Sequence, residues 1–102
     1  MTRYVKVGKV DDIASGQAKV VTVNNKQIAI FNQGGSYYAI DDACTHRGGP
    51  LSEGFCDDGI VTCPWHSAQF RLDSGEAVGP PASRGVTSYR VRTTDGEVEI
   101  EI

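Results

Sequence analysis

Alternation of apolar and polar positions marks both ends of this chain. Residues 97–102 alternate valine and isoleucine with acidic side chains, and several other short segments are rich in β-branched or aromatic residues. A period of two predicts strands with one buried face. The predicted strands are residues 4–7, 18–23, 26–31, 36–40, 88–93 and 97–102. Residues 10–14 are predicted to form a single helical turn.

Turn signals separate these segments. Asn24-Asn25 and Asp95-Gly96 tolerate positive φ, and each pair predicts a tight hairpin between its flanking strands. Gly34-Gly35 predicts a turn into residues 36–40, the third strand of one meander. Many short strands with glycine-rich turns predict an all-β fold, an antiparallel β-sandwich or small barrel.

The middle of the chain, residues 43–85, has a different composition. It holds all four prolines, all three cysteines, both histidines and the only tryptophan. Strand-like pieces occur there only at residues 60–63 and 69–72. A segment with so little apolar periodicity needs another source of order, and a metal centre is the natural candidate. We expect a single domain, residues 1–102, with a metal-binding subdomain over about residues 43–85.

Two short motifs in this region carry metal-ligating side chains. The first motif is Cys44-Thr45-His46 and the second is Cys63-Pro64-Trp65-His66, with residues 47–62 between them. Thiolates and imidazoles are ligands of iron–sulfur clusters, zinc and copper, and two facing loops of this kind supply four ligands. Both histidines of the chain fall within these motifs, which argues against chance placement. Cys56 lies outside them, and we interpret it as a packed thiol.

A structural zinc module is one alternative, because two cysteines and two histidines also form a zinc site. Zinc fingers usually pair two cysteines in one loop and two histidines in the other. Here each motif contributes one cysteine and one histidine. A visible absorption spectrum separates the two readings, since a zinc protein is colourless.

The spacing of the two motifs resembles the Rieske [2Fe–2S] motif. Residues 63–70, 73–77 and 79–82 are similar to the soluble ferredoxins of bacterial aromatic-ring-hydroxylating dioxygenase systems, and the resemblance extends over essentially the whole chain. It implies a Rieske fold of three β-sheets with a cluster-binding subdomain inserted between strands. It also implies one [2Fe–2S] cluster per chain. The implied ligands are Cys44 and Cys63 on one iron and His46 and His66 on the other.

The function implied by this resemblance is one-electron transfer. The protein would carry electrons from a flavin-dependent NAD(P)H reductase to a terminal oxygenase. An oxygenase also needs a mononuclear iron held by two further histidines and a carboxylate, and this chain has no further histidines. It also lacks the G-x-G-x-x-G motif of a nucleotide-binding reductase. We therefore expect this protein to be an electron carrier and not an enzyme. The rival within the family is an accessory subunit of a larger redox enzyme, such as an assimilatory nitrite reductase.

The resemblance also assigns roles to neighbouring residues. Pro64 and Trp65 would cover the cluster, and Pro80-Pro81 would form a loop that closes over it. Gly48 and Gly49 would let the backbone approach the cluster closely. His46 and His66 would form the electron exit, and partners would dock around them. The implied docking residues are Arg47, Gly48, Trp65, Pro80 and Pro81.

Some positions depart from patterns found within the family. Ser67 stands where glycine is common. High-potential members carry a pair of cysteines at the positions of Gly49 and Trp65, which form a disulfide. They also carry a serine and a tyrosine, both donors to sulfur, at the positions of Ala68 and Phe70. Since this chain has none of these devices, we predict a low reduction potential.

Composition limits the kinds of partner and the cellular compartment that the sequence predicts. The chain is 39% hydrophobic and 23% charged with a net charge of −3, which disfavours nucleic acid as a partner. No segment approaches the roughly 18 apolar residues of a membrane span, and the N-terminus has no apolar signal-peptide core. Three cysteines do not suggest a secreted disulfide scaffold. We expect a cytoplasmic monomer with no membrane partner.

Overall fold

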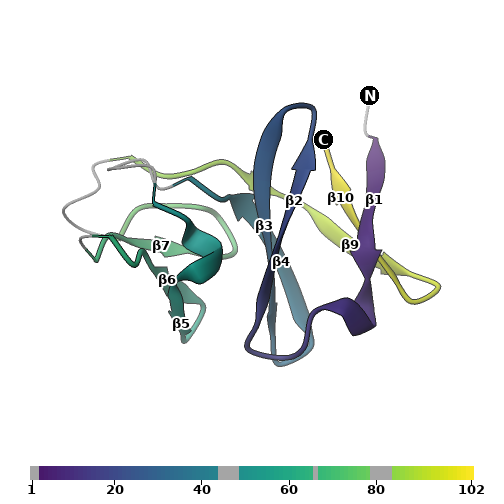
Figure 1. Ribbon diagram of the computed structural model, residues 1–102, viewed down its shortest axis with the longest axis horizontal. Helices are drawn as coiled ribbons and strands as arrows, with labels where there is room; N and C mark the ends of the chain where they lie inside the picture. Colours follow the sequence, from purple (N-terminus) through teal and green to yellow (C-terminus); the bar gives the residue numbers. More distant parts are fainter. Residues whose placement is uncertain (1–2, 44–48, 66, 79–83) are drawn as a thin grey trace.

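The computed structural model describes residues 3–43, 49–65, 67–78 and 84–102 (Figure 1). Nearly all regular structure in these ranges is β-strand. The strands are β1 (Tyr4–Lys9), β2 (Ala18–Val23), β3 (Lys26–Gln33), β4 (Ser36–Asp41), β5 (Phe55–Asp57), β6 (Ile60–Thr62), β7 (Gln69–Arg71), β8 (Ser88–Tyr89), β9 (Val91–Thr94) and β10 (Glu97–Glu101). Two 3-10 helices, η1 (Val10–Asp12) and η2 (Leu51–Glu53), lie between them. In these ranges no helix is long and apolar enough to cross a membrane.

The strands form three antiparallel sheets. Their orders are β1-β10-β9, β2-β3-β4-β8 and β5-β6-β7. The third sheet falls within the region that the sequence predicts to bind the metal, and Figure 1 shows it on the side of the molecule away from both termini. The predicted all-β class and the three-sheet arrangement are confirmed.

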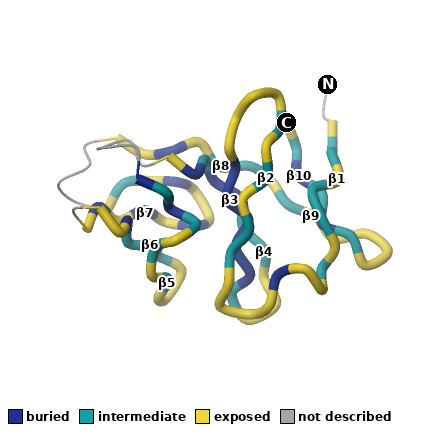
Figure 2. Tube along the Cα trace, viewed as in Figure 1, coloured by how far each residue is buried: buried dark blue, intermediate teal, exposed yellow. Residues whose placement is uncertain are grey.

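The central sheet, β2-β3-β4-β8, is buried on both faces. Ile28 and Ile30 of β3 share one core with Val98 and Ile100 of β10. The alternate β3 residues share a second core with the third sheet. This second core contains Ala29, Phe31, Ile40, Leu51, Val61, Cys63, Ala68, Phe70, Leu72 and Val86. Because both faces are covered, β3 is buried continuously from residue 28 to 32, the dark blue run in Figure 2. The third sheet is therefore held by apolar packing as well as by its connecting loops.

The predicted hairpins and the helical turn are confirmed. Asn24 and Asn25 have φ of 51° and 65°, and Asp95 and Gly96 have φ of 52° and 78°. Positive φ at both central residues is the signature of the tight turns that match strand twist. The predicted turn at residues 10–14 is η1, in which the Lys9 N–H donates to the Asp12 carboxylate at 3.0 Å.

Residues 88–93 do not form the single strand predicted. β8 pairs with β4 in the central sheet, whereas β9 pairs with β10 in the terminal sheet. The break falls at Arg90, whose carbonyl accepts the Glu101 N–H at 2.9 Å. One straight strand cannot lie in two sheets that differ in direction, so the chain bends where it changes sheets.

Strand β5 is an element that the sequence analysis missed. Phe55 and Asp57 are exposed and only Cys56 turns inward, so the segment shows no apolar alternation. The missed signal was the turn that follows it. Asp58 and Gly59 have φ of 51° and 77°, the same arrangement as Asp95-Gly96, and they join β5 to β6.

Candidate metal centre

Cys63 is the one predicted ligand that lies within the described ranges. It follows β6 directly, is 1% exposed, and donates its main-chain N–H to the Ala68 carbonyl at 2.7 Å. That bond closes the loop of the second motif and fixes where Cys63 leaves the sheet. The other three predicted ligands, Cys44, His46 and His66, lie outside the described residues.

The Cys63 sulfur has a main-chain donor and a glycine beside it. The Trp65 N–H donates to Sγ at 3.4 Å. A Cβ placed on Gly49 would lie 2.8 Å from Sγ and 2.9 Å from Cγ of Trp65, closer than real Cβ contacts allow. The chain after the first motif therefore approaches the second motif at this sulfur, and only glycine permits it. Gly49 therefore lies close to the Cys63 sulfur, whereas the predicted approach to a cluster stays a prediction, and Gly48 lies outside the described residues.

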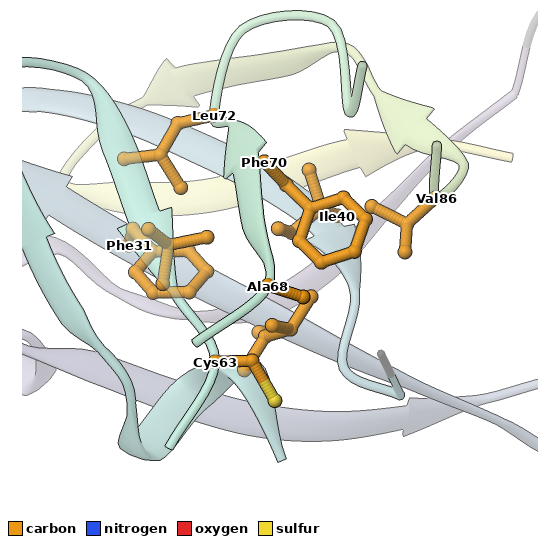
Figure 3. Close-up of a cluster of buried hydrophobic side chains, with 10 residues drawn as sticks. Phe31, Ile40, Cys63, Ala68, Phe70, Leu72 and Val86 are labelled. Atoms are coloured by element: carbon orange, nitrogen blue, oxygen red, sulfur yellow. The ribbon is translucent and has the colours of Figure 1, made fainter. Parts of the chain in front are cut away.

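These surroundings fit a thiolate ligand of a metal cluster. A main-chain N–H directed at sulfur stabilises the negative thiolate, as hydrogen bonds to cluster sulfurs generally do. Figure 3 shows the sulfur pointing away from the apolar side chains of Phe31, Ile40 and Phe70. Cys63 belongs to this buried core, and its sulfur is directed away from these three side chains.

The two positions at which the family resemblance places sulfur donors in high-potential members are apolar and fully buried in this chain. Ala68 and Phe70 are both 0% exposed and belong to the same core as Cys63 (Figure 3). The position after the second histidine has unusual backbone geometry, because Ser67 has a φ of 63°. A left-handed conformation explains why glycine is common at this position.

Asp42 holds the chain on either side of the first motif, and the sequence analysis did not identify it. Its side-chain Oδ1 accepts the Ser52 N–H at 2.8 Å, and its carbonyl accepts the Leu51 N–H at 2.7 Å. Ala43 and Pro50 form an antiparallel bridge between these contacts. Asp42 is 5% exposed. The available sequence signal was weak, an acid two residues before Cys44, because its hydrogen-bond partner Ser52 lies ten positions later.

The preceding residue, Asp41, links strands β4 and β8 of the central sheet through its side chain. The Tyr89 hydroxyl of β8 donates to Asp41 Oδ1 at 2.6 Å. Burial and this carboxylate raise the pKa of Tyr89 well above its usual value of about 10.

The remaining cysteine, Cys56, behaves as a packed thiol. It is half-buried on β5 and packs against the second core. Burial raises the pKa of its thiol, which disfavours the thiolate that binds metals. Trp65, one of the residues assigned to docking, is 50% exposed. Arg47, Pro80 and Pro81 lie outside the described residues.

Comparison with known proteins gives consistent matches. The family model of the Rieske [2Fe–2S] domain matches residues 3–90. The chain is 39% identical over 94 residues to the 3-phenylpropionate/cinnamic acid dioxygenase ferredoxin subunit of Escherichia coli strain K12, a match that covers 91% of this chain and 88% of that subunit.

Solved structures agree with the sequence matches. The ferredoxin of Sphingomonas yanoikuyae B1 is 27% identical and superposes with a TM-score of 0.90 over 98% of this chain and 99% of that one. A chain from the complex of reduced oxygenase and oxidized ferredoxin in carbazole 1,9a-dioxygenase is 30% identical. It superposes with a TM-score of 0.88, over 95% of this chain and 91% of that one.

Proposed function

This chain belongs to the Rieske [2Fe–2S] domain family, and from that membership we propose that it is the ferredoxin of a multicomponent oxygenase system. It would accept one electron from a flavin-dependent NAD(P)H reductase and deliver it to a terminal oxygenase. In this role the protein carries electrons and does not itself catalyse a reaction. We propose that it works as a cytoplasmic monomer.

Family membership implies one [2Fe–2S] cluster in the chain, and we propose Cys44, His46, Cys63 and His66 as its ligands. When bound, the cluster supplies reversible uptake of a single electron. Neutral imidazoles in place of two thiolates lower the negative charge of the site, so an added electron is accommodated more easily. Rieske centres accordingly lie at about −150 to +300 mV, against about −400 mV for all-cysteine plant ferredoxins.

The observation that supports this proposal best is the environment of the Cys63 sulfur. Its amide donor from Trp65 and the glycine at position 49 suit a cluster ligand. Cys56 provides the contrast, since it lies outside both motifs and burial raises the pKa of its thiol. The two cysteines are therefore a matched pair for an experiment.

The test is metal and sulfide analysis of protein made anaerobically with ample iron. We expect a brown-red protein with about two irons and two acid-labile sulfides per chain. Cys63→Ser should lose most of the iron, whereas Cys56→Ser should keep it. One zinc per chain without sulfide would refute the proposal, and so would equal iron in the two variants.

Partner identity needs a kinetic test. The carbazole 1,9a-dioxygenase complex contains an oxygenase with its ferredoxin, and the Escherichia coli relative is named as a dioxygenase subunit. We expect the reduced protein to be reoxidised by its oxygenase in a reaction that saturates with oxygenase concentration. Permanent copurification with one large redox enzyme would favour the accessory-subunit alternative instead.

A further inference from the structure

Asp42 is a buried carboxylate beside the first motif, and its burial calls for an explanation. It is 5% exposed and stands two residues before Cys44. Burying an ionised carboxylate is strongly unfavourable unless hydrogen bonds compensate, and an apolar side chain of similar size often fills such a place at no loss of stability. A carboxylate here therefore suggests a role other than packing.

The contacts of Asp42 join the two ends of the segment that carries the first motif. Strand β4 ends at Asp41, and the helix η2 begins at Leu51, beyond the first motif. The Asp42 carbonyl accepts the Leu51 N–H at 2.7 Å, and its Oδ1 accepts the Ser52 N–H at 2.8 Å. Pro50, at the N-cap of η2, makes no side-chain capping bond. Asp42 thus supplies the acceptor that the start of this helix needs.

The same residue is fixed to the rigid part of the fold. The Asp42 N–H donates to the carbonyl of Gln27 in β3 at 3.0 Å. Leu51 is 0% exposed and belongs to the core that Phe31 of β3 also lines. Both ends of the segment are consequently held against the central sheet. Ligands on a segment with fixed ends keep their places better than ligands on a free loop.

We propose that Asp42 is a positioning residue for the iron–sulfur site, which fastens the segment that bears Cys44 and His46 to the central sheet. The inference rests on the proposed function, because it takes those residues as ligands.

The experiment compares three variants purified with their iron. Asp42→Ala removes the acceptor and the charge, Asp42→Asn keeps an acceptor oxygen and removes the charge, and Asp41→Asn serves as the neighbouring control. The measurements are the rate of iron loss to a chelator and the exchange rates of the Leu51 and Ser52 amides in iron-free protein.

Expected results differ for each variant. Asp42→Ala should lose iron about tenfold faster, equivalent to about 1.4 kcal/mol, and its Leu51 and Ser52 amides should exchange faster. Asp42→Asn should restore an iron-loss rate close to that of the unchanged protein, because its amide oxygen can still accept the Ser52 N–H. Asp41→Asn should keep the iron-loss rate within about twofold, since its partner Tyr89 lies in β8.

Three results would overturn the inference. The first is an iron-loss rate in Asp42→Ala equal to that of Asp41→Asn. The second is faster exchange spread evenly over all three sheets, which would show a general structural role. The third is an iron-loss rate in Asp42→Asn as fast as that of Asp42→Ala, although the acceptor oxygen is kept. If the unchanged protein bound no iron, the proposed function would fail, and the amide exchange in iron-free protein would still decide whether Asp42 fastens this segment.

Discussion

Gly49 shows how one residue can control the approach of two loops. A Cβ at this position would meet both Cys63 Sγ and the Trp65 ring, at 2.8 and 2.9 Å. We predict that Gly49→Ala destabilises the iron-loaded protein by about 1–3 kcal/mol, the usual range for overpacking, and lowers its iron content. Denaturant unfolding and iron analysis are the measurements.

Gly8→Ala is the control for this prediction. Its added Cβ would meet only the ends of the flexible Lys19 and Asp12 side chains, at 3.2 and 3.4 Å. Little change is expected. Equal losses in the two variants would show that the approach of Gly49 to Cys63 has no special importance.

Ser67 is held in a backbone conformation that suits glycine. A φ of 63° costs a residue with a Cβ about 1–2 kcal/mol of conformational energy, and glycine avoids this cost. Glycine loses more backbone entropy on folding, however, so the net gain is smaller. We predict that Ser67→Gly raises the free energy of unfolding by up to about 1 kcal/mol. Ser36→Gly, at the start of β4, should lower it by about 0.5–1 kcal/mol. A loss of stability in Ser67→Gly would contradict the argument.

The reduction potential depends on donors near the cluster sulfurs. Ala68 and Phe70 offer no side-chain donor, so we predict a potential near −150 mV, at the low end of the Rieske range. Ala68→Ser should raise it by tens of millivolts, since one electron corresponds to about 43 mV per kcal/mol. Voltammetry at neutral pH is the measurement, with Ala14→Ser at an exposed position as the control. A midpoint above about +100 mV would refute this reasoning.

Among the structural elements, the turns that depend only on neighbouring residues were predicted correctly from the sequence. Asn24-Asn25 and Asp95-Gly96 specify their hairpins through backbone conformation, and both were predicted correctly. The break at Arg90 could not be predicted, because it exists only where two sheets meet. β5 was missed because an edge strand with one inward side chain has no periodicity, although Asp58-Gly59 indicated its turn.

The short strand β8 is attached to the central sheet by a bond that should depend on pH. The Tyr89 hydroxyl donates to Asp41, which together with burial raises the pKa of Tyr89. Above about pH 10 the unfolded chain loses the phenol proton while the folded protein keeps it, so the free energy of unfolding should fall as pH rises.

The variant that tests this is Tyr89→Phe. We predict a loss of about 1 kcal/mol at neutral pH and a shallower decline of stability above pH 10. Tyr38→Phe is the control, because Tyr38 packs against the second core from the same strand as Asp41. Unfolding measured from pH 7 to 11 gives both quantities, and parallel declines in the two variants would contradict the role of Tyr89.

For the molecule as a whole, the two cores explain how a sheet with little apolar pattern is held in place. The third sheet contributes Val61 and Phe70, and the turn after β7 contributes Leu72, to the core that this sheet shares with the central sheet. The sequence suggested metal as the source of order in this region, and the structure adds an apolar contribution. The assignment of Cys44, His46, Cys63 and His66 as ligands rests on motif spacing and family resemblance, and it stays a prediction. The role of Asp42 could not be inferred from the sequence, since it depends on Ser52 and on the central sheet.

The molecule extends over 39 × 29 × 18 Å, with the third sheet on the side away from both termini (Figure 1). A partner that takes electrons through the proposed site must therefore approach that side. Trp65 is half exposed there and adjoins Cys63 and Gly49. Exposed aromatic residues at such places often dominate binding energy. We predict that Trp65→Ala slows electron transfer to the cognate oxygenase about tenfold at sub-saturating concentrations.

The control for Trp65→Ala is Val20→Ala, which changes an apolar side chain of β2 that is 39% exposed. Its rate should match that of the unchanged protein. Absorption spectra and potentials must first show that the iron site is intact in both variants, so that a slower rate reports docking.

Because the chain carries a net charge of −3, added salt should slow the reaction with a basic partner. If Trp65→Ala transferred electrons as fast as Val20→Ala at every salt concentration, docking at this surface would be excluded.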